Sequence, residues 1–279
     1  RQSHHYIKNK CYVKFYENNI INKKNIINQK NIINKKNIIN QKNIITCFPD
    51  EIKQAYISKS LDHLKNRFLK KFNLNNFYTF TKPCIFFGVY NDEDLLVLRR
   101  MRSNIYIMWG GTDIDLKFKL RKNNLNKILK LNINNFYSIS DNIQERLNLI
   151  NLKNNRFELN LVDKTLFYPI SFKGSCIFIY NGLKPGNEII YGETFYKKIE
   201  VSLPNFTFIY SNKLNLPYHE MPNIYRKCFI GLRLTENDGN ANIVQELNEM
   251  NIPVIHNSNE YKTLHWKDEK DIIKHILNN

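Results

Sequence analysis

The sequence predicts an α/β protein of two domains, each built on a parallel β-sheet. Short apolar runs alternate along the chain with segments of helical periodicity, which is the order of β-α-β units. The length of 279 residues suffices for two domains of ordinary size. A break from Pro169 to Gly174 separates two such series. We therefore expect an N-terminal domain over 1–168 and a C-terminal domain over 169–279.

The N-terminal series begins with a long amphipathic helix, which we expect over 51–72 with Asp50 as its cap. In the helix expected over 92–103, the inward side chains are Leu95, Leu96 and Leu98. The remaining elements expected in this series are strands at 84–90, 105–109, 136–140 and 156–162 and helices at 120–130 and 141–152.

The C-terminal series repeats this alternation after the break. Its apolar runs predict four strands, and the segments between them predict helices. The elements expected are strands at 176–180, 206–210, 229–234 and 252–256 and helices at 188–202, 222–227, 240–251 and 268–277.

Residues 20–45 repeat the hexapeptide IINKKN or IINQKN four times. Paired isoleucines every six residues wander around a helix and point to both faces of a strand, so neither element gains one buried stripe. A regular β-solenoid is an alternative. We interpret the repeat as an inserted low-complexity loop that does not carry the site.

Composition excludes several classes of protein. A 42% apolar and 13% aromatic content can fill a core, which excludes wholesale disorder. No apolar run approaches the roughly 18–20 residues of a membrane-spanning helix, and no signal peptide is recognisable. Five scattered cysteines without a C-x-x-C pair argue against a disulfide framework and a zinc site, which favours the cytoplasm. Since the chain begins with Arg1, we expect it to be part of a longer polypeptide.

The positive charge lies in the first half of the chain. The formal net charge is +17, of which residues 1–150 carry +16. Asn, at 44 residues, is very abundant, and with Lys and Ile it belongs to A/T-rich codons, so we attribute much of this charge to codon bias. The alternative is an acidic acceptor or an anionic membrane surface that contacts the first half.

The most informative stretch runs from Thr235 to Glu246, where a strand leads through a polar loop into a helix. The free N–H groups at the start of such a helix suit a diphosphate. Glu246 has a carboxylate that can accept hydrogen bonds from ribose or sugar hydroxyls. In the alternative interpretation, Asp238 and Asn240 only cap the helix and Glu246 faces water.

The spacing Asp238-x7-Glu246, followed by Pro253-Val-Ile, resembles the donor-site signature of retaining GT-B glycosyltransferases. Those enzymes typically carry E-x7-E, so Asp replaces the first Glu here. The resemblance implies two Rossmann-like domains that face each other across a cleft. It also implies that Glu246 binds the nucleotide ribose. Asp238, a candidate catalytic residue, would meet the transferred sugar, and the donor-binding set would include Gly239, Asn240 and Asn242.

A second segment, Trp109-Gly-Gly-Thr-Asp113, resembles the His-Gly-Ser/Thr-Asp loop that lines the cleft of this family opposite the donor. Gly110, Gly111 and Thr112 form this candidate cleft loop, with Asp113 as the second candidate catalytic residue. Two glycines after a strand also let a ligand approach the backbone closely. The alternative is a tight turn in which Asp113 caps the next helix. The segments 140–146 and 221–228 resemble the family as well.

Three features depart from the family. The family places an Arg and a Lys near the donor diphosphate, whereas residues 181–186 hold Lys184 without the Arg. Arg233, at the end of a strand, is a candidate to share this work. Trp109 stands where the family has His, and the first domain is short and interrupted by the repeat.

We therefore expect a glycosyltransferase that moves a sugar from a nucleotide-sugar, with neither a cofactor nor a metal, to a glycan, protein or lipid acceptor. The resemblance implies a retaining outcome. A cytoplasmic location is expected, with peripheral contact to an anionic membrane as an addition. The alternatives are a basic nucleic-acid-binding or scaffold protein, a sugar-nucleotide epimerase of the same fold, and an inactive donor-binding homologue. We see no recognisable nucleic-acid module, and the lysines are dispersed, so nucleic acid is not the expected partner.

Overall fold

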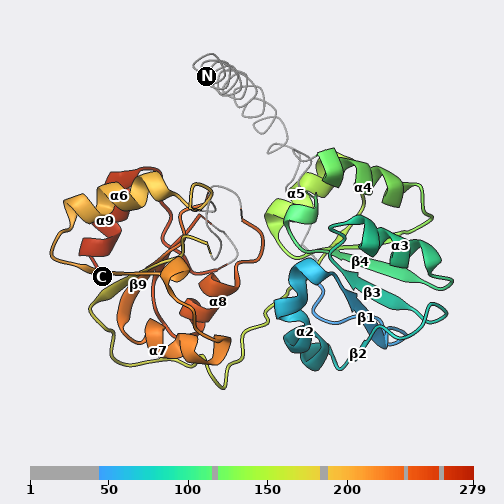
Figure 1. Ribbon diagram of the computed structural model, residues 1–279, viewed down its shortest axis with the longest axis horizontal. Helices are drawn as coiled ribbons and strands as arrows, with labels where there is room; N and C mark the ends of the chain where they lie inside the picture. The colour runs from blue at the N-terminus through green and yellow to red at the C-terminus, as the bar shows by residue number, and fades with distance from the viewer. Residues whose placement is uncertain (1–43, 115–118, 183–187, 236–237, 258–260) are drawn as a thin grey trace, which may run out of the picture. The chain divides into compact units, whose positions relative to one another are not determined.

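The computed structural model describes residues 44–114, 119–182, 188–235, 238–257 and 261–279. Residues 44–279 form one compact unit that contains two parallel β-sheets, one of six strands and one of four (Figure 1). The predicted α/β class and the predicted parallel sheets are confirmed. Nearly all of the hexapeptide repeat lies outside the described residues.

The first sheet has the strand order β2-β1-β3-β4-β5-β6, and every neighbouring pair is parallel. Its strands are β1 (Gln54–Ile57), β2 (Asn75–Asn76), β3 (Cys84–Phe87), β4 (Ile105–Trp109), β5 (Asn135–Ser138) and β6 (Asn155–Arg156). The helices of this part are η1 (Lys59–Leu64), α2 (Lys65–Phe72), α3 (Asp92–Arg100), η2 (Thr112–Ile114), α4 (Lys119–Leu129) and α5 (Asp141–Leu149).

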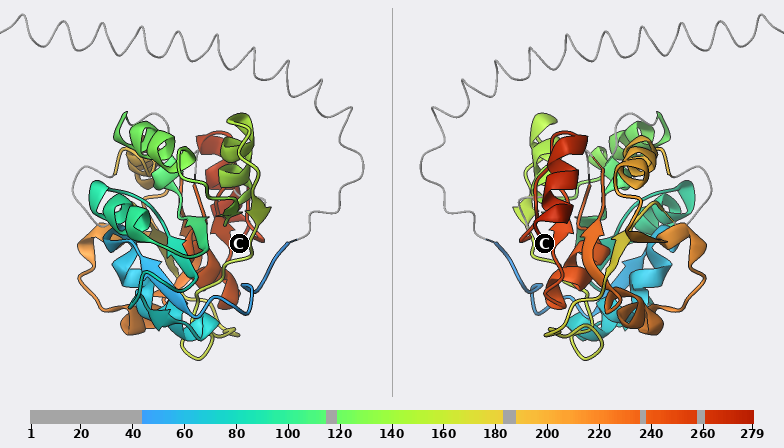
Figure 2. Two further views of the ribbon diagram at one scale, coloured as in Figure 1. Left: turned by 90° about the vertical axis from the view of Figure 1, so that its right-hand side faces the viewer. Right: turned by 90° about the vertical axis from the view of Figure 1, so that its left-hand side faces the viewer.

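The second sheet has the strand order β10-β9-β7-β8, again with all pairs parallel. Its strands are β7 (Cys176–Ile179), β8 (Thr207–Tyr210), β9 (Cys228–Leu232) and β10 (Val254–Ile255). Its helices are α6 (Glu193–Ser202), η3 (Ser211–Lys213), η4 (Tyr218–Glu220), α7 (Met221–Tyr225), α8 (Asn242–Glu249) and α9 (Glu269–Leu277). In Figures 1 and 2, α9 is the red helix at the C-terminal end of the chain.

The second sheet separates two hydrophobic clusters because side chains alternate between the faces of a strand. Ile177 and Ile179 of β7 pack in one cluster with residues of α6 and α9. Phe178, between them, packs in the other cluster with residues of α7 and α8. Helices therefore cover both faces, as parallel sheets require.

Polar side chains fix the starts of several helices. Asn91 caps α3 in a capping box with Asp94, Ser140 caps α5, and Asp268 caps α9. Each accepts a backbone N–H that the first helical turn leaves without a partner. The helices that we expected at 92–103, 141–152 and 268–277 thus begin within one residue of the predicted start.

The helix that we expected over 51–72 is wrong in its first part, because β1 occupies residues 54–57 and pairs with β2 and β3. Gln54 is fully buried there, and its side-chain amide donates to the carbonyl oxygens of Thr79 and Lys82. Ser58, rather than Asp50, caps the helical segment that follows. Pairing with two strands outweighs the helical spacing of the apolar residues.

Two smaller expectations also differ from the structure. Leu95 and Leu98 are buried on α3, but Leu96 is 60% exposed, since it lies about 100° around the helix from Leu95. Of the strand that we expected over 156–162, only Arg156 lies in β6. All strands of the first sheet precede residue 168, and all strands of the second sheet follow it. The domain boundary at residue 168 stays a prediction.

Candidate functional site

The segment that resembles the donor-site signature folds as a strand, a loop, a helix and a strand. β9 ends at Leu232, α8 begins at Asn242, and β10 pairs with β9 in parallel. The loop that holds Asp238 therefore lies at the carboxyl edge of the sheet, where ligands of such sheets bind.

The first turn of α8 has no side-chain cap among the described residues. Its N-cap residue is Ala241, and Asn242 is the first helical residue. The alternative in which Asp238 and Asn240 cap this helix is therefore wrong. No side chain of the described residues caps the first backbone N–H groups of α8, so this turn suits an anion.

Asp238 instead forms an ion pair with Arg233, which follows β9. The other carboxylate oxygen of Asp238 accepts the N–H of Gly239 at 2.9 Å. The Arg233 guanidinium lies over two aromatic rings, 4.3 Å from the ring centre of Tyr180 and 4.9 Å from that of Tyr191. Burial alone would lower the pKa of Arg233, but the Asp238 carboxylate raises it above its ordinary value. Arg233 is thus a fixed cation that orients Asp238.

His256 completes this cluster from the end of β10, where its side chain is 1% exposed. Its Nδ1 lies 3.0 Å from the carbonyl oxygen of Arg233, and its Nε2 lies 3.9 Å from Oδ2 of Asp238. Burial lowers the pKa of His256, and the opposing effect of Asp238 is smaller. The ring is therefore neutral at neutral pH.

Asn240 joins the loop to other segments of the chain. Its side chain donates to the carbonyl oxygen of Leu159 and accepts hydrogen bonds from Gln245 and Tyr261. These contacts hold the backbone between Asp238 and α8, so Asn240 shapes the loop through its side chain.

Glu246 lies in the second turn of α8 and is 4% exposed. The hydroxyl of Tyr225 donates to its Oε2 at 2.9 Å, and Nη1 of Arg67 lies 3.9 Å from its Oε1. Burial raises the pKa of Glu246 to about 7, although the hydrogen bond from Tyr225 and the charge of Arg67 act in the opposite direction. The alternative in which Glu246 faces water is wrong.

Asp113 is also buried, and it holds the glycine loop after β4. Its carboxylate accepts the N–H groups of Gly110 at 3.0 Å, Gly111 at 2.8 Å and Val89 at 3.3 Å. Burial raises its pKa to about 6 against the effect of these hydrogen bonds. Thr112 begins the short helix η2, which contains Asp113. Asp113 therefore lies within a tight turn and stabilises it through the backbone N–H groups that its carboxylate accepts.

The two candidate loops lie side by side. A Cβ atom placed on Gly239 would lie 3.7 Å from the Cα of Gly111. Next to this contact, Nδ2 of Asn142 donates to the carbonyl oxygen of Asp238 at 3.2 Å. The structure thus brings the loop after β4 together with the loop after β9.

Lys184 lies outside the described residues, so its relation to this site stays a prediction. Trp109, which replaces the His of the family, is fully buried and stacks on Phe136. Its Nε1 has no hydrogen-bond partner among the described residues. Trp109 is therefore part of the core under the glycine loop.

The sequence did not identify the aromatic and basic side chains that surround Asp238 and Glu246. Tyr180 follows β7 directly, so its place at the carboxyl edge was a usable signal. Arg67 and Tyr225 give no such signal, because they reach Glu246 from distant segments.

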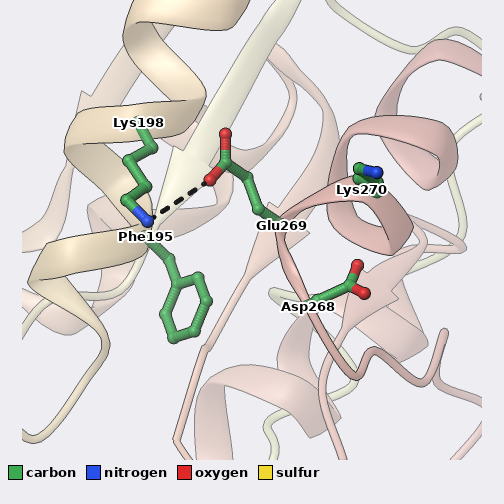
Figure 3. A pocket seen from close by; sticks show the side chains of 5 residues that line it. All are labelled: Phe195, Lys198, Asp268, Glu269 and Lys270. Carbon is green, nitrogen blue, oxygen red and sulfur yellow. Dashed lines mark ion pairs between the residues drawn. The ribbon is translucent and has the colours of Figure 1, made fainter.

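Two hollows lie in the second half of the chain. The larger, of about 360 Å³, lies between α6 and α9, where Lys198 and Glu269 pair at 3.7 Å (Figure 3). The other, of about 280 Å³, includes Asn181 and Tyr210. Neither hollow is lined by an acid of the candidate site.

No protein-family model matches the chain, and no curated protein matches its sequence. Among the described residues, no helix is both long enough and apolar enough to span a membrane. The same residues contain no cluster of three or more His, Cys, Asp or Glu that could hold a metal ion.

Proposed function

We propose that the chain is a glycosyltransferase of the GT-B type that transfers a sugar from a nucleotide-sugar to a glycan, protein or lipid acceptor. One observation carries this proposal: Asp238, Glu246 and Pro253 have the spacing of the donor-site signature, and they lie in the loop after β9, on α8 and just before β10. The resemblance adds a retaining outcome and a mechanism without a metal ion.

The start of α8 is the proposed site of the donor diphosphate. Its uncapped first turn supplies N–H groups and the positive end of the helix dipole. These groups, together with Lys184, would stabilise the negative charge that develops on the departing nucleoside diphosphate. Arg233 is neutralised by Asp238, so we assign it to orienting that carboxylate rather than to the diphosphate.

The two acids of the motif have different proposed roles. Asp238, held by Arg233 and by the N–H of Gly239, would accept hydroxyl groups of the transferred sugar. Glu246 would accept the ribose hydroxyls through Oε1, since Tyr225 already donates to Oε2. Asp113 is engaged by three backbone N–H groups, which supports a role in shaping the cleft loop.

The test is thermal unfolding with UDP, GDP and ADP and with their glucose and mannose conjugates. A ligand at one hundred times its dissociation constant stabilises the protein by about 2.7 kcal/mol, which raises the melting temperature measurably. We expect one nucleotide series to raise it in the wild-type protein and in Glu249→Gln, the matched control one turn along α8. Glu246→Gln should lose the effect, because a neutral amide accepts ribose hydroxyls more weakly.

Equal shifts in the two variants would remove Glu246 from the site. No shift with any nucleotide, in a sample shown to be folded by circular dichroism, would overturn the proposed function.

A donor-binding protein without turnover is the second candidate. The observation that favours it is the Arg233–Asp238 ion pair, which leaves fewer cations for the diphosphate. Binding of a nucleotide-sugar without cleavage would support this candidate.

A further inference from the structure

We propose that His256 is a specificity-determining residue whose Nε2, together with the carboxylate of Asp238, binds neighbouring hydroxyl groups of the transferred sugar. The inference rests on the proposed function and deepens it, because it names the part of the donor that this cluster recognises. The ligand chemistry is a pair of hydroxyl donors.

The hydrogen bond at Nδ1 determines which nitrogen of His256 carries the proton. Nδ1 lies 3.0 Å from the carbonyl oxygen of Arg233, and a carbonyl oxygen only accepts hydrogen bonds. Nδ1 must therefore donate, and in a neutral ring Nε2 then carries a lone pair. The charged and titratable groups that act on this ring are Asp238, Arg233 and His265.

The lone pair of Nε2 needs a donor that the described part of the chain does not supply. Asp238 Oδ2 is 3.9 Å away, which exceeds hydrogen-bond distance, and the carboxylate also only accepts. Because His256 is 1% exposed and buried polar groups are hydrogen-bonded as a rule, these two acceptors would be satisfied by hydroxyl donors that lie beside both of them. Neighbouring hydroxyls of a sugar supply such donors.

The position of the ring fits the transferred sugar rather than the nucleoside. His256 follows β10, and Asp238 precedes α8, so both lie at the carboxyl edge of the sheet beside the uncapped helix turn. Glu246, the proposed ribose ligand, lies in the second turn of α8 among the side chains of α7 and α2. A diphosphate at the start of α8 would separate these two places.

The backbone at His256 is held by pairing with Leu264. The N–H of His256 donates to the carbonyl oxygen of Leu264 at 3.0 Å, and the N–H of Leu264 donates to the carbonyl oxygen of Val254 at 2.8 Å. With Nδ1 held by Arg233 as well, the ring has one orientation, which is what a specificity-determining group requires.

The first measurement needs no ligand. ¹⁵N chemical shifts of the histidine rings at pH 7.5 distinguish the two neutral tautomers, and the spectrum of His256→Asn assigns the signal of His256. We expect a proton on Nδ1 and a lone pair on Nε2. A proton on Nε2 would overturn the inference, since that nitrogen could then no longer accept a hydroxyl.

The second measurement compares dissociation constants of UDP and GDP with those of UDP-glucose and GDP-mannose by calorimetry. The side chain of Asn keeps a donor near the place of Nδ1 and removes Nε2, so His256→Asn deletes only the proposed acceptor. We expect the nucleotide-sugar to bind about tenfold more weakly and the matching nucleoside diphosphate to bind unchanged. His275→Asn on α9 is the matched control and should change neither.

Each outcome decides between the two proposals. A loss of affinity for both ligands in His256→Asn would make His256 a structural residue, and no loss for either would remove it from the site. Failure of every nucleotide to bind the wild-type protein would instead overturn the proposed function, and the inference with it.

Discussion

At the residue scale, the candidate site depends on acidic side chains whose burial disfavours the ionised carboxylate. Glu246 and Asp113 are 4% and 1% exposed, and burial raises the pKa of both carboxyl groups. Arg233 is buried beside Asp238 in the same way. Buried charges cost stability unless they are paired, and perturbed pKa values of this kind are frequent at functional sites.

Glu246 therefore makes the stability of the protein depend on pH. Its pKa is near 4.5 in the unfolded chain and about 7 in the folded protein, so the folded state holds the proton over this interval. Stability should consequently fall as pH rises from 4.5 to 7. We expect Glu246→Gln to match the wild type at pH 4 and to exceed its free energy of unfolding at pH 8 by about 1–3 kcal/mol.

Urea unfolding at pH 4, 6 and 8 measures this difference. Asp113 and His256 titrate in both proteins, so the difference between the two isolates Glu246. A difference that does not change with pH would show that the carboxyl group titrates alike in the folded and unfolded chain.

Asp238 and Glu246 also show how much of the candidate site could be predicted from the sequence. The spacing of Asp238 and Glu246 placed both acids correctly on a loop and a helix. It could not supply their partners, because Arg67 and Tyr225 contact Glu246 across long stretches of sequence.

At the scale of elements, most strands and helices were predictable because their apolar spacing agrees with their tertiary contacts. β1 was not, since the apolar residues around it have helical spacing and its pairing partners lie beyond residue 74. The burial of Gln54 could not be predicted either, because its side-chain amide is bonded to backbone groups of residues 78–82.

Asp94 connects β1 with α3 and should matter most among the acids of that helix. It is 1% exposed, and its carboxylate accepts the hydroxyl of Ser58 at 2.8 Å, the hydroxyl of Tyr56 at 3.0 Å and the N–H of Tyr90 at 2.7 Å. Asp94→Asn should lower the free energy of unfolding by about 2–4 kcal/mol, because an amide group would face these donors.

The matched control is Asp92→Asn in the first turn of the same helix. Asp92 forms an exposed ion pair with Lys127 at 3.1 Å, so its loss should cost less than about 1 kcal/mol. Equal urea midpoints for the two variants would contradict the role assigned to Asp94.

At the scale of the whole molecule, two parallel sheets with helices agree with the class that the alternating sequence predicted. The contact between Gly239 and Gly111 brings the loops after β9 and β4 together, which the sequence predicted only through the resemblance. Codon bias as the source of the excess positive charge of residues 1–150 stays a prediction, and so does the alternative of an acidic acceptor or an anionic membrane surface.

Release of nucleoside diphosphate from each nucleotide-sugar, measured in the presence of EDTA, tests the central claim most directly. Water can replace the acceptor slowly, so we expect the folded protein to cleave one nucleotide-sugar without a metal ion. Asp238→Asn should reduce this rate at least tenfold, because the carboxylate that holds the sugar becomes a neutral amide. Binding without cleavage of any nucleotide-sugar, or equal rates for Asp238→Asn and the wild type, would contradict the account.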